Sequence, residues 1–416
     1  MKKFLAVIAV VALVCLGSMA FAADVTVGGS VQLRSRDFKT LNFDKNSTAG
    51  DQTDTQERIE LDVNVKAGDD VKGKIAIWND FDDWGRFEQV QGNNGFGNST
   101  AATGGHFGIR EAWLSFNFPG IPVNLTGGHQ LLALGQGWFF RSKHFGSDAW
   151  VLANVTGANT VALVDVKVAE GSVALAHDDA DAYVILDVFK INDNNIVGID
   201  ITNANFRNAL TAGQFDLWNY SVNYTGKIGP VGLKAQADLQ SGKIDTSPVS
   251  PKFKGNEIVV QGNIPVDPVA INFTLARGSG NKIGSTDNDG YVNFLDIDPH
   301  YTFLYEYKTV TAAGAKNTGF SNTTAASVGV AADLSKSVKV ALDYWYLQAT
   351  EKITNGLGTT SSDVGSEIDA TINWKLYDNL TWNWNLGYFK PGDAMKTAAG
   401  TTDAATGIQG ILSLNF

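Results

Sequence analysis

Hydrophobic and polar residues alternate along many short segments of this chain. In "EIDATINWK", residues 367–375, Ile368, Ile372 and Trp374 occupy one parity while charged and polar residues occupy the other. The segment "RIELDVNVK", residues 58–66, repeats this pattern. Because successive side chains of a β-strand point to opposite faces, such alternation predicts strands with one apolar face and one hydrated face.

The same pattern predicts about eighteen strands, within a range of about 16 to 20. Their ranges are 24–36, 54–67, 70–79, 107–118, 122–129, 148–154, 159–168, 182–190, 195–202, 215–225, 231–239, 256–263, 269–277, 325–333, 337–349, 365–375, 380–389 and 407–416. The segment "YTFLYEYK", residues 301–308, is interpreted either as a rim extension of a strand or as half of another hairpin.

Short turns and long polar segments alternate between these strands. The turns include "PGIP" at 119–122, "KIGP" at 227–230 and "LYDN" at 376–379, and the long segments include 81–106 and 278–324. A soluble β-sandwich does not require short connections at one end and long ones at the other. A transmembrane β-barrel does show this asymmetry, with short periplasmic turns and long extracellular loops. The predicted fold class is therefore all-β, a closed antiparallel transmembrane β-barrel with an even number of strands.

The first 22 residues, "MKKFLAVIAVVALVCLGSMAFA", have the basic start, the apolar run and the small-residue end of a secretory signal peptide. The expected organisation is a signal peptide over 1–22 and one barrel domain over 23–416. The one cysteine, Cys15, lies in this leader, so we expect neither a disulfide nor a thiolate metal site in the barrel. A net charge of −11 argues against nucleic acid as a partner.

The last predicted strand ends in "IQGILSLNF", with Phe416, Leu414 and Leu412 on one parity. With the leader and the repeated alternating strands, this ending resembles that of Gram-negative outer-membrane porins. The resemblance implies an outer-membrane location among lipid and lipopolysaccharide, and a terminal strand read as an assembly signal by the barrel-assembly machinery. It further implies passage of small hydrophilic solutes and includes a homotrimer among the expected assemblies.

A narrower similarity lies in "VNLTGGHQLLALGQGWFF", residues 123–140. It resembles the segment of alginate-export-type barrels with eighteen strands in which a strand ends in Gly-Arg-Gln and a long arch follows. His129 stands where that pattern has an arginine. The similarity therefore supports the strand count and not a polyuronate substrate.

If the apolar parity faces lipid, the opposite parity lines the lumen, and a barrel of this size encloses water. The basic residues predicted to line the pore are Arg34, Arg58, Lys66, Lys72, Lys74, Lys167, Lys234, Lys339 and Lys375. The acidic ones are Glu60, Asp62, Asp165, Asp187, Asp200, Asp238, Glu257, Asp343, Glu367 and Asp369. The near balance of the two sets decides little, while the overall acidity favours a weak preference for cations.

The arch at 130–147 is the segment predicted to narrow the channel. Its apolar start is followed by Arg141, Lys143 and His144, which can fold inward and place positive charge opposite the acidic wall. The alternative is an extracellular lid with no effect on conductance.

Three functions follow from a barrel of this kind. The first is a porin for passive diffusion of small hydrophilic solutes and ions. The second is a channel dedicated to a sugar or an organic acid, with Trp78, Trp113 and Trp345 stacking on the substrate. The third is a scaffold barrel that sheathes a partner such as a cytochrome. No nucleophile motif and no ligand spacing among the histidines is present in the sequence, so we expect no enzyme, no metal site and no cofactor.

Overall fold

The computed structural model describes residues 23–80, 82–83, 107–170, 179–207, 214–245, 250–295, 300–308 and 318–416. The predicted leader lies outside these residues. The first strands are β1 (Ala23–Lys39), β2 (Gln52–Ala67), β3 (Val71–Trp78), β5 (Gly108–Asn117), β6 (Val123–Ala133), β7 (Phe140–Thr156), β8 (Asn159–Ala169), β9 (Ala180–Asn192) and β10 (Asn195–Phe206). The others are β11 (Gln214–Ile228), β12 (Val231–Asp245), β13 (Asn256–Val266), β14 (Val269–Gly278), β16 (Thr323–Asp333), β17 (Val338–Thr354), β18 (Thr360–Tyr377), β19 (Leu380–Pro391) and β20 (Ala405–Asn415).

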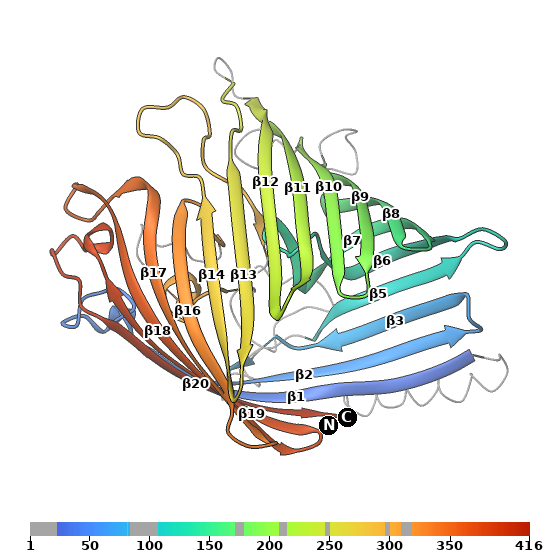
Figure 1. The fold of residues 1–416 in the computed structure, drawn as a ribbon, viewed down its shortest axis with the longest axis horizontal. Coiled ribbons are helices and arrows are strands. Elements are labelled where there is room, and N and C mark those ends of the chain that lie inside the picture. The colour runs from blue at the N-terminus through green and yellow to red at the C-terminus, as the bar shows by residue number, and fades with distance from the viewer. Residues whose placement is uncertain are drawn as a thin grey trace, which may run out of the picture.

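These eighteen strands of the described residues form one antiparallel sheet in which each strand pairs with the next along the chain (Figure 1). The sheet closes because β20 pairs with β1, with Leu414 opposite Val31 and Leu412 opposite Leu33. Each predicted strand is confirmed. Two further strands of two residues each, β4 (Asp82–Asp83) and β15 (Phe294–Leu295), pair with β2 and, in parallel, with β7.

The seam of the barrel depends on a glycine. The Gly29 amide donates to the Phe416 carbonyl oxygen at 3.0 Å, and the Phe416 amide donates back to the Gly29 carbonyl oxygen at 3.1 Å. A Cβ on Gly29 would lie 2.3 Å from the Glu60 carbonyl oxygen on the other neighbouring strand. No larger residue fits between the two neighbours without moving backbone, so this position keeps β1 close to both.

The burial of alternate residues shows which parity faces out. Large apolar side chains such as Leu342, Ile368 and Leu275 are 45–56% exposed, and they lie on the outer face. Their neighbours of opposite parity point into the barrel. Among the residues that the structure describes, none of the helices has the length and apolarity needed for a membrane span.

Several connections fold back into the barrel and pack on its inner wall. Two buried apolar clusters form there: one centres on Phe38, Phe320 and Trp345, the other on Phe139, Leu217 and Tyr291. The residues come both from strands and from the connections 134–139, 250–255, 279–295, 300–308 and 318–322. The wall is thus apolar in places where an open channel would be polar throughout.

The segment 301–308 is one of these inward connections, so the prediction of a rim extension or another hairpin was wrong. Its last residues form the short helix α2 (Tyr305–Lys308). The amides of Leu304 and Tyr305 donate to the Glu367 carboxylate, at 2.5 and 2.9 Å, and Tyr301 stacks on Phe320 with ring centroids 4.2 Å apart. The alternating aromatics mimic a strand, but they anchor the segment to the inner wall instead.

Candidate functional site

The inner faces of β1, β2 and β5 carry four arginines, Arg34, Arg36, Arg58 and Arg110, which we call the arginine wall. Arg36 forms a bidentate pair with Asp54, at 2.8 and 2.7 Å, and also donates to the Tyr307 hydroxyl at 3.5 Å. Arg34, one inward position away, donates to the amide oxygen of Gln56 at 3.0 Å. Bidentate contacts of this kind fix a guanidinium in one orientation, so the wall is preorganised.

Trp78, at the end of β3, holds the other two arginines in place. The guanidinium carbons of Arg58 and Arg110 lie 4.7 and 4.8 Å from the centre of its ring system, within cation–π range. Arg110 also donates to Glu60 at 2.5 Å and to the Lys143 carbonyl oxygen at 3.0 Å. One indole thus ties together side chains from β2 and β5, across β3.

Arg58 forms a salt bridge with Asp80, and the His144 imidazole lies 2.8 Å from the second oxygen of the same carboxylate. His144 is buried and packs edge-on against Trp78, with centroids 5.0 Å apart. Burial alone would raise the pKa of the Asp80 carboxyl, but the hydrogen bond from His144 and the charge of Arg58 outweigh it and hold the pKa below its ordinary value. Asp80 is therefore ionised at neutral pH and links the arch to the wall.

A second ion-paired tier lies nearer the short turns. The Lys74 ammonium contacts Asp62 at 3.1 Å and Glu111 at 2.5 Å. Glu111 also accepts a hydrogen bond from the Trp113 indole at 2.9 Å. These pairs give β2, β3 and β5 a continuous polar inner surface, as the alternation predicts.

The opposite wall is acidic, but most of its carboxylates are covered. Asp200, Asp238 and Glu257 lie in one row across β10, β12 and β13, with Ser221 of β11 between the first two, and they are only 1–3% exposed. Glu367 is fully buried beneath the inward segment 301–308. These residues point inward, as predicted, yet protein rather than water covers them.

Basic residues of the inner face are more accessible. Lys72, Lys234, Lys339 and Lys375 are exposed and lie close to the short turns. Two of them form exposed salt bridges, Lys339 with Asp333 and Lys375 with Asp378. Asp343 and Asp369 are partly exposed on the same side of β17 and β18. The near balance of acidic and basic residues in the predicted pore-lining set therefore does not describe the charges that are exposed to a solute in the lumen.

The arch does fold inward. The Gln136 amide donates to the Gln236 side chain at 2.7 Å, and its carboxamide donates to the Thr225 hydroxyl at 2.7 Å, so the arch reaches β11 and β12 from its origin between β6 and β7. Trp138 packs against Phe320 with centroids 4.8 Å apart. Of the three predicted constriction residues, His144 joins the arginine wall, whereas Lys143 is exposed and Arg141 lies beside Leu295 of β15.

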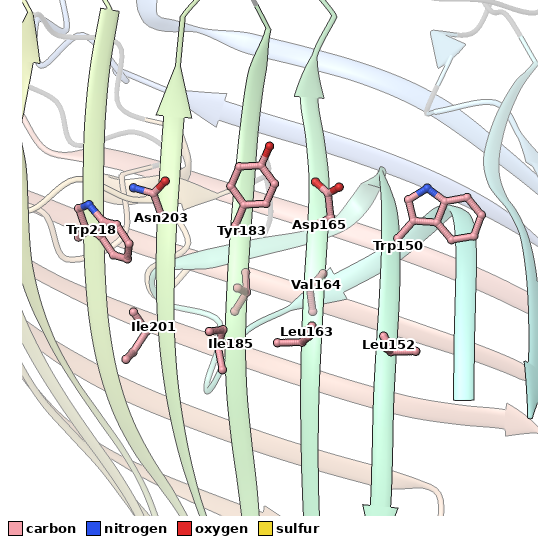
Figure 2. Close-up of a pocket in the computed structure, with 11 residues that line it drawn as sticks. Trp150, Leu152, Leu163, Val164, Asp165, Tyr183, Ile185, Ile201, Asn203 and Trp218 are labelled. Carbon is pink, nitrogen blue, oxygen red and sulfur yellow. The ribbon is translucent and has the colours of Figure 1, made fainter. Parts of the chain in front are cut away.

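The prediction that Asp165, Lys167 and Asp187 line the lumen was wrong. Asp165 shares the outward parity of Leu163 on β8, and Figure 2 shows it on the same row as Trp150 and Tyr183. The inward residues of this strand, such as Val164 and Val166, are apolar because they pack against the second buried cluster. Where both faces contain apolar residues, polarity alone cannot assign the faces.

Two of the tryptophans expected to stack on a substrate already pack against other side chains of the protein. Trp345 is buried in the first apolar cluster, and Trp78 lies between two guanidinium groups. Other members of the arginine-wall network were missed, among them Arg36, Asp54, Arg110 and Asp80. Arg36 follows the parity of Arg34 and could have been found from it, whereas Arg110 lies beside a register shift in the β3–β5 pairing and Asp80 lies beyond the end of β3.

No family model and no curated protein matches the chain. Solved structures share its fold. Pseudomonas aeruginosa OccK9 (OpdG) superposes with a TM-score of 0.61 at 10% identity, over 94% of this chain and 99% of that one. P. aeruginosa OpdK with vanillate gives 0.59 at 8% identity, over 94% and 98%, and P. aeruginosa OccK2 (OpdF) in complex with glucuronate gives 0.58 at 11%, over 94% and 96%. The predicted porin-type barrel is thereby confirmed as a fold.

Proposed function

We propose that this protein is an outer-membrane channel through which small hydrophilic solutes diffuse passively, and that it favours organic acids over cations. The observation that carries the proposal is the unequal burial of the predicted pore-lining charges: four of the carboxylates are buried, while the lysines near the turns are exposed and Arg34, Arg58 and Arg110 are partly exposed. Within this set of predicted pore-lining residues, the charges exposed to a solute in the lumen are then mainly basic. Such a surface favours anions.

The outer face supports the location. Exposed apolar side chains alternate with the inward polar ones along the strands, as a barrel in a bilayer requires, and closure leaves no free sheet edge. No chemical step is needed for such a channel, so the proposal includes no enzymatic activity. Lipid and lipopolysaccharide would surround the barrel.

The arginine wall also suits a carboxylate by its chemistry. Guanidinium groups bind carboxylates through paired N–H donors, and those of Arg34, Arg58 and Arg110 lie on three neighbouring tiers of the inner wall. Two of the structural neighbours were solved with vanillate and with glucuronate, both of which are carboxylates. We therefore favour an organic acid over a neutral sugar as the preferred solute, and over the weak cation preference suggested by overall acidity.

Liposome swelling tests this preference. Proteoliposomes are diluted into isotonic glucose or isotonic sodium glucuronate, two solutes of similar size that differ by a carboxylate. Faster swelling in glucuronate supports the proposal, and the replacement of Arg34, Arg58 and Arg110 by glutamine should abolish the difference while leaving glucose entry intact. Equal rates in the wild type would refute the preference for acids and leave a general porin.

A scaffold that sheathes a partner is the weaker alternative. The arch and the segment 301–308 already pack against the inner wall, and their aromatic residues occupy part of the space that a partner would need. Co-purification of a stoichiometric partner, with no conductance from the isolated barrel, would favour the scaffold instead.

A further inference from the structure

Three carboxylates of the inner wall lie in one row beneath the inward connections. In the register of the sheet, Asp200 lies opposite Ser221, and Ser221 lies opposite Asp238. Asp238 in turn lies opposite Glu257, and Figure 1 shows the four strands, β10 to β13, side by side. The three acidic residues are 1–3% exposed. Carboxylates on adjacent strands destabilise the sheet when both are charged, so this row requires compensating positive charge or bound protons.

Hydrogen bonds show that Asp238 is ionised. A backbone N–H can only donate, and that of Val292 donates to the side-chain oxygen of Gln240 at 3.0 Å. The Gln240 nitrogen then donates to the side-chain oxygen of Asn219 at 3.2 Å, and the Asn219 nitrogen donates to Asp238 at 2.9 Å. The direction of each bond in this chain follows from the first one.

The other oxygen of Asp238 accepts a hydrogen bond whose direction is fixed in the same way. The backbone N–H of Gln136, in the arch, donates to the side-chain oxygen of Gln236 at 2.7 Å, so the Gln236 nitrogen donates to Asp238 at 2.8 Å. Both carboxylate oxygens accept N–H donors, which is the pattern of a charged carboxylate. In the described part of the chain, no lysine or arginine forms a salt bridge with Asp238, so this buried charge needs another partner.

Six buried oxygen atoms around this charge have no hydrogen-bond partner among the described residues. They are both carboxylate oxygens of Glu257, one carboxylate oxygen of Asp200, and the hydroxyl oxygens of Thr202, Ser221 and Tyr291. Folded proteins pair nearly all buried polar atoms, so a group of such oxygens marks the place of a bound ion or water.

Tyr291, in the connection 279–295, covers the row. It is 2% exposed and packs in the second apolar cluster with Leu217 of β11. Its Cα lies 2.8 Å from the position of a Cβ built on Gly255, one inward position before Glu257. The charges of Asp238 and Glu257 both act on its hydroxyl group. This hydroxyl group therefore belongs to the same pocket as the carboxylates.

The chemistry of this pocket favours a hard cation. Its orphaned atoms are all oxygens, and its carboxylates exclude an anion. Ca²⁺ accepts irregular sets of about six to eight oxygen ligands, whereas Mg²⁺ demands a near-ideal octahedron. No three carboxylates or imidazoles of the described residues lie close enough to share one ion, and Asp200 stands two strands, about 10 Å, from Asp238. The Asp238–Glu257 pair is therefore the place for the ion, and its two negative charges match those of Ca²⁺.

We propose that the inner wall binds a calcium ion between Asp238 and Glu257, with the hydroxyl groups of Ser221 and Tyr291 as further ligands. The ion thereby links the wall to the connection 279–295. The sequence predicts no metal site because ligand spacing is read within one segment, whereas these ligands come from four separate parts of the chain. The site goes beyond the proposed channel function and does not depend on the preference for organic acids.

Calcium binding to the purified barrel tests the site. The barrel is dialysed against a calcium chelator, and binding is then measured by equilibrium dialysis with radioactive calcium, from about 1 μM to about 1 mM free ion in about 0.15 M sodium chloride. Over this range the wild type should bind one ion more per barrel than Glu257→Gln, which keeps the shape of the side chain and removes its charge. Tyr291→Phe, which keeps the ring and loses the hydroxyl group, should weaken the affinity by about three- to tenfold.

The matched control is Glu367→Gln, because Glu367 is also fully buried but its carboxylate already accepts two backbone amides. Its calcium binding should equal that of the wild type. Equal binding by the wild type and Glu257→Gln overturns the site, and this is the result expected if protons or sodium ions neutralise the row. If Glu257→Gln does not assemble, an unchanged affinity of Tyr291→Phe overturns the site instead.

Conductance is recorded on the same preparations. A wild-type barrel that conducts but binds no more calcium than Glu257→Gln refutes the calcium site alone. A barrel that binds the additional ion but does not conduct supports the site and refutes the proposed channel function.

Discussion

Glu367 is the residue on which the inward position of segment 301–308 depends most. Its carboxylate is fully buried and accepts the amides of Leu304 and Tyr305 at 2.5 and 2.9 Å. Hydrogen bonds to a charged group contribute about 1.5–3 kcal/mol each, so Glu367→Leu should weaken docking of the segment by about 3–6 kcal/mol. At about 1.4 kcal/mol per tenfold, the undocked population rises by about two to four powers of ten.

Single-channel recording in planar bilayers reports this change. We expect Glu367→Leu to give a larger or noisier conductance, because the segment leaves the inner wall. Glu367→Gln should give a smaller effect of the same sign, since the amide oxygen still accepts one hydrogen bond.

The matched control is Asp343→Asn, on the neighbouring strand and facing the same side. Its carboxylate forms no hydrogen bond with the described residues 300–308, so its conductance trace should match that of the wild type in noise. An unchanged trace for Glu367→Leu, in a barrel that is correctly folded by heat-modifiable gel mobility, would refute the anchoring role.

Other predictions concern the wall, the arch and the seam. Replacing Arg58 or Arg110 with glutamine should lower the anion-to-cation permeability ratio by about three- to tenfold, because a partly buried charge interacts with a passing ion by about 1 kcal/mol. Reversal potentials in a salt gradient measure this ratio. The pKa of Asp80 in the folded protein lies below its ordinary value. The ionised carboxylate therefore stabilises the fold fully above the ordinary pKa, and this stabilisation is lost as the pH falls through the lowered pKa. The thermal unfolding temperatures of wild type and Asp80→Asn should thus differ at pH 7 and converge in acid. Deleting residues 134–143 should raise single-channel conductance if the arch constricts the pore, and unchanged conductance would refute the constriction. Gly29→Leu should block barrel closure, seen as loss of the heat-modifiable band, whereas Gly108→Ala, with open space around its Cβ, should not. Phe416→Ala should lower the yield of assembled barrel if the terminal aromatic is an assembly signal, with Asn415→Ala as the control.

Alternation predicted the strands because each one separates two environments along its whole length. This alternation rule accounts for the pairing of each strand with the next and for the closure of the sheet. It also accounts for the inward position of residues such as Arg34, Asp62 and Lys74. The rule failed on β8, where the inward residues Val164 and Val166 pack against inward connections and both faces hold apolar side chains.

The inward connections could not be predicted for a different reason. Their positions depend on contacts between residues far apart in the sequence, such as Gln136 with Gln236 and Leu304 with Glu367. A pattern within one segment carries no information about such partners. The same limit applies to Asp80, whose role depends on Arg58 and His144 from two other parts of the chain.

The most direct test of the account is the reversal potential of the purified barrel in a planar bilayer with a tenfold gradient of potassium chloride. We expect stepwise ohmic conductance and a reversal potential with the sign of an anion-preferring pore, because the exposed charges among the predicted pore-lining residues are mainly basic. A preparation that inserts without conducting, or that conducts with the opposite sign, would contradict the proposal that the arginine wall and the exposed lysines define the channel.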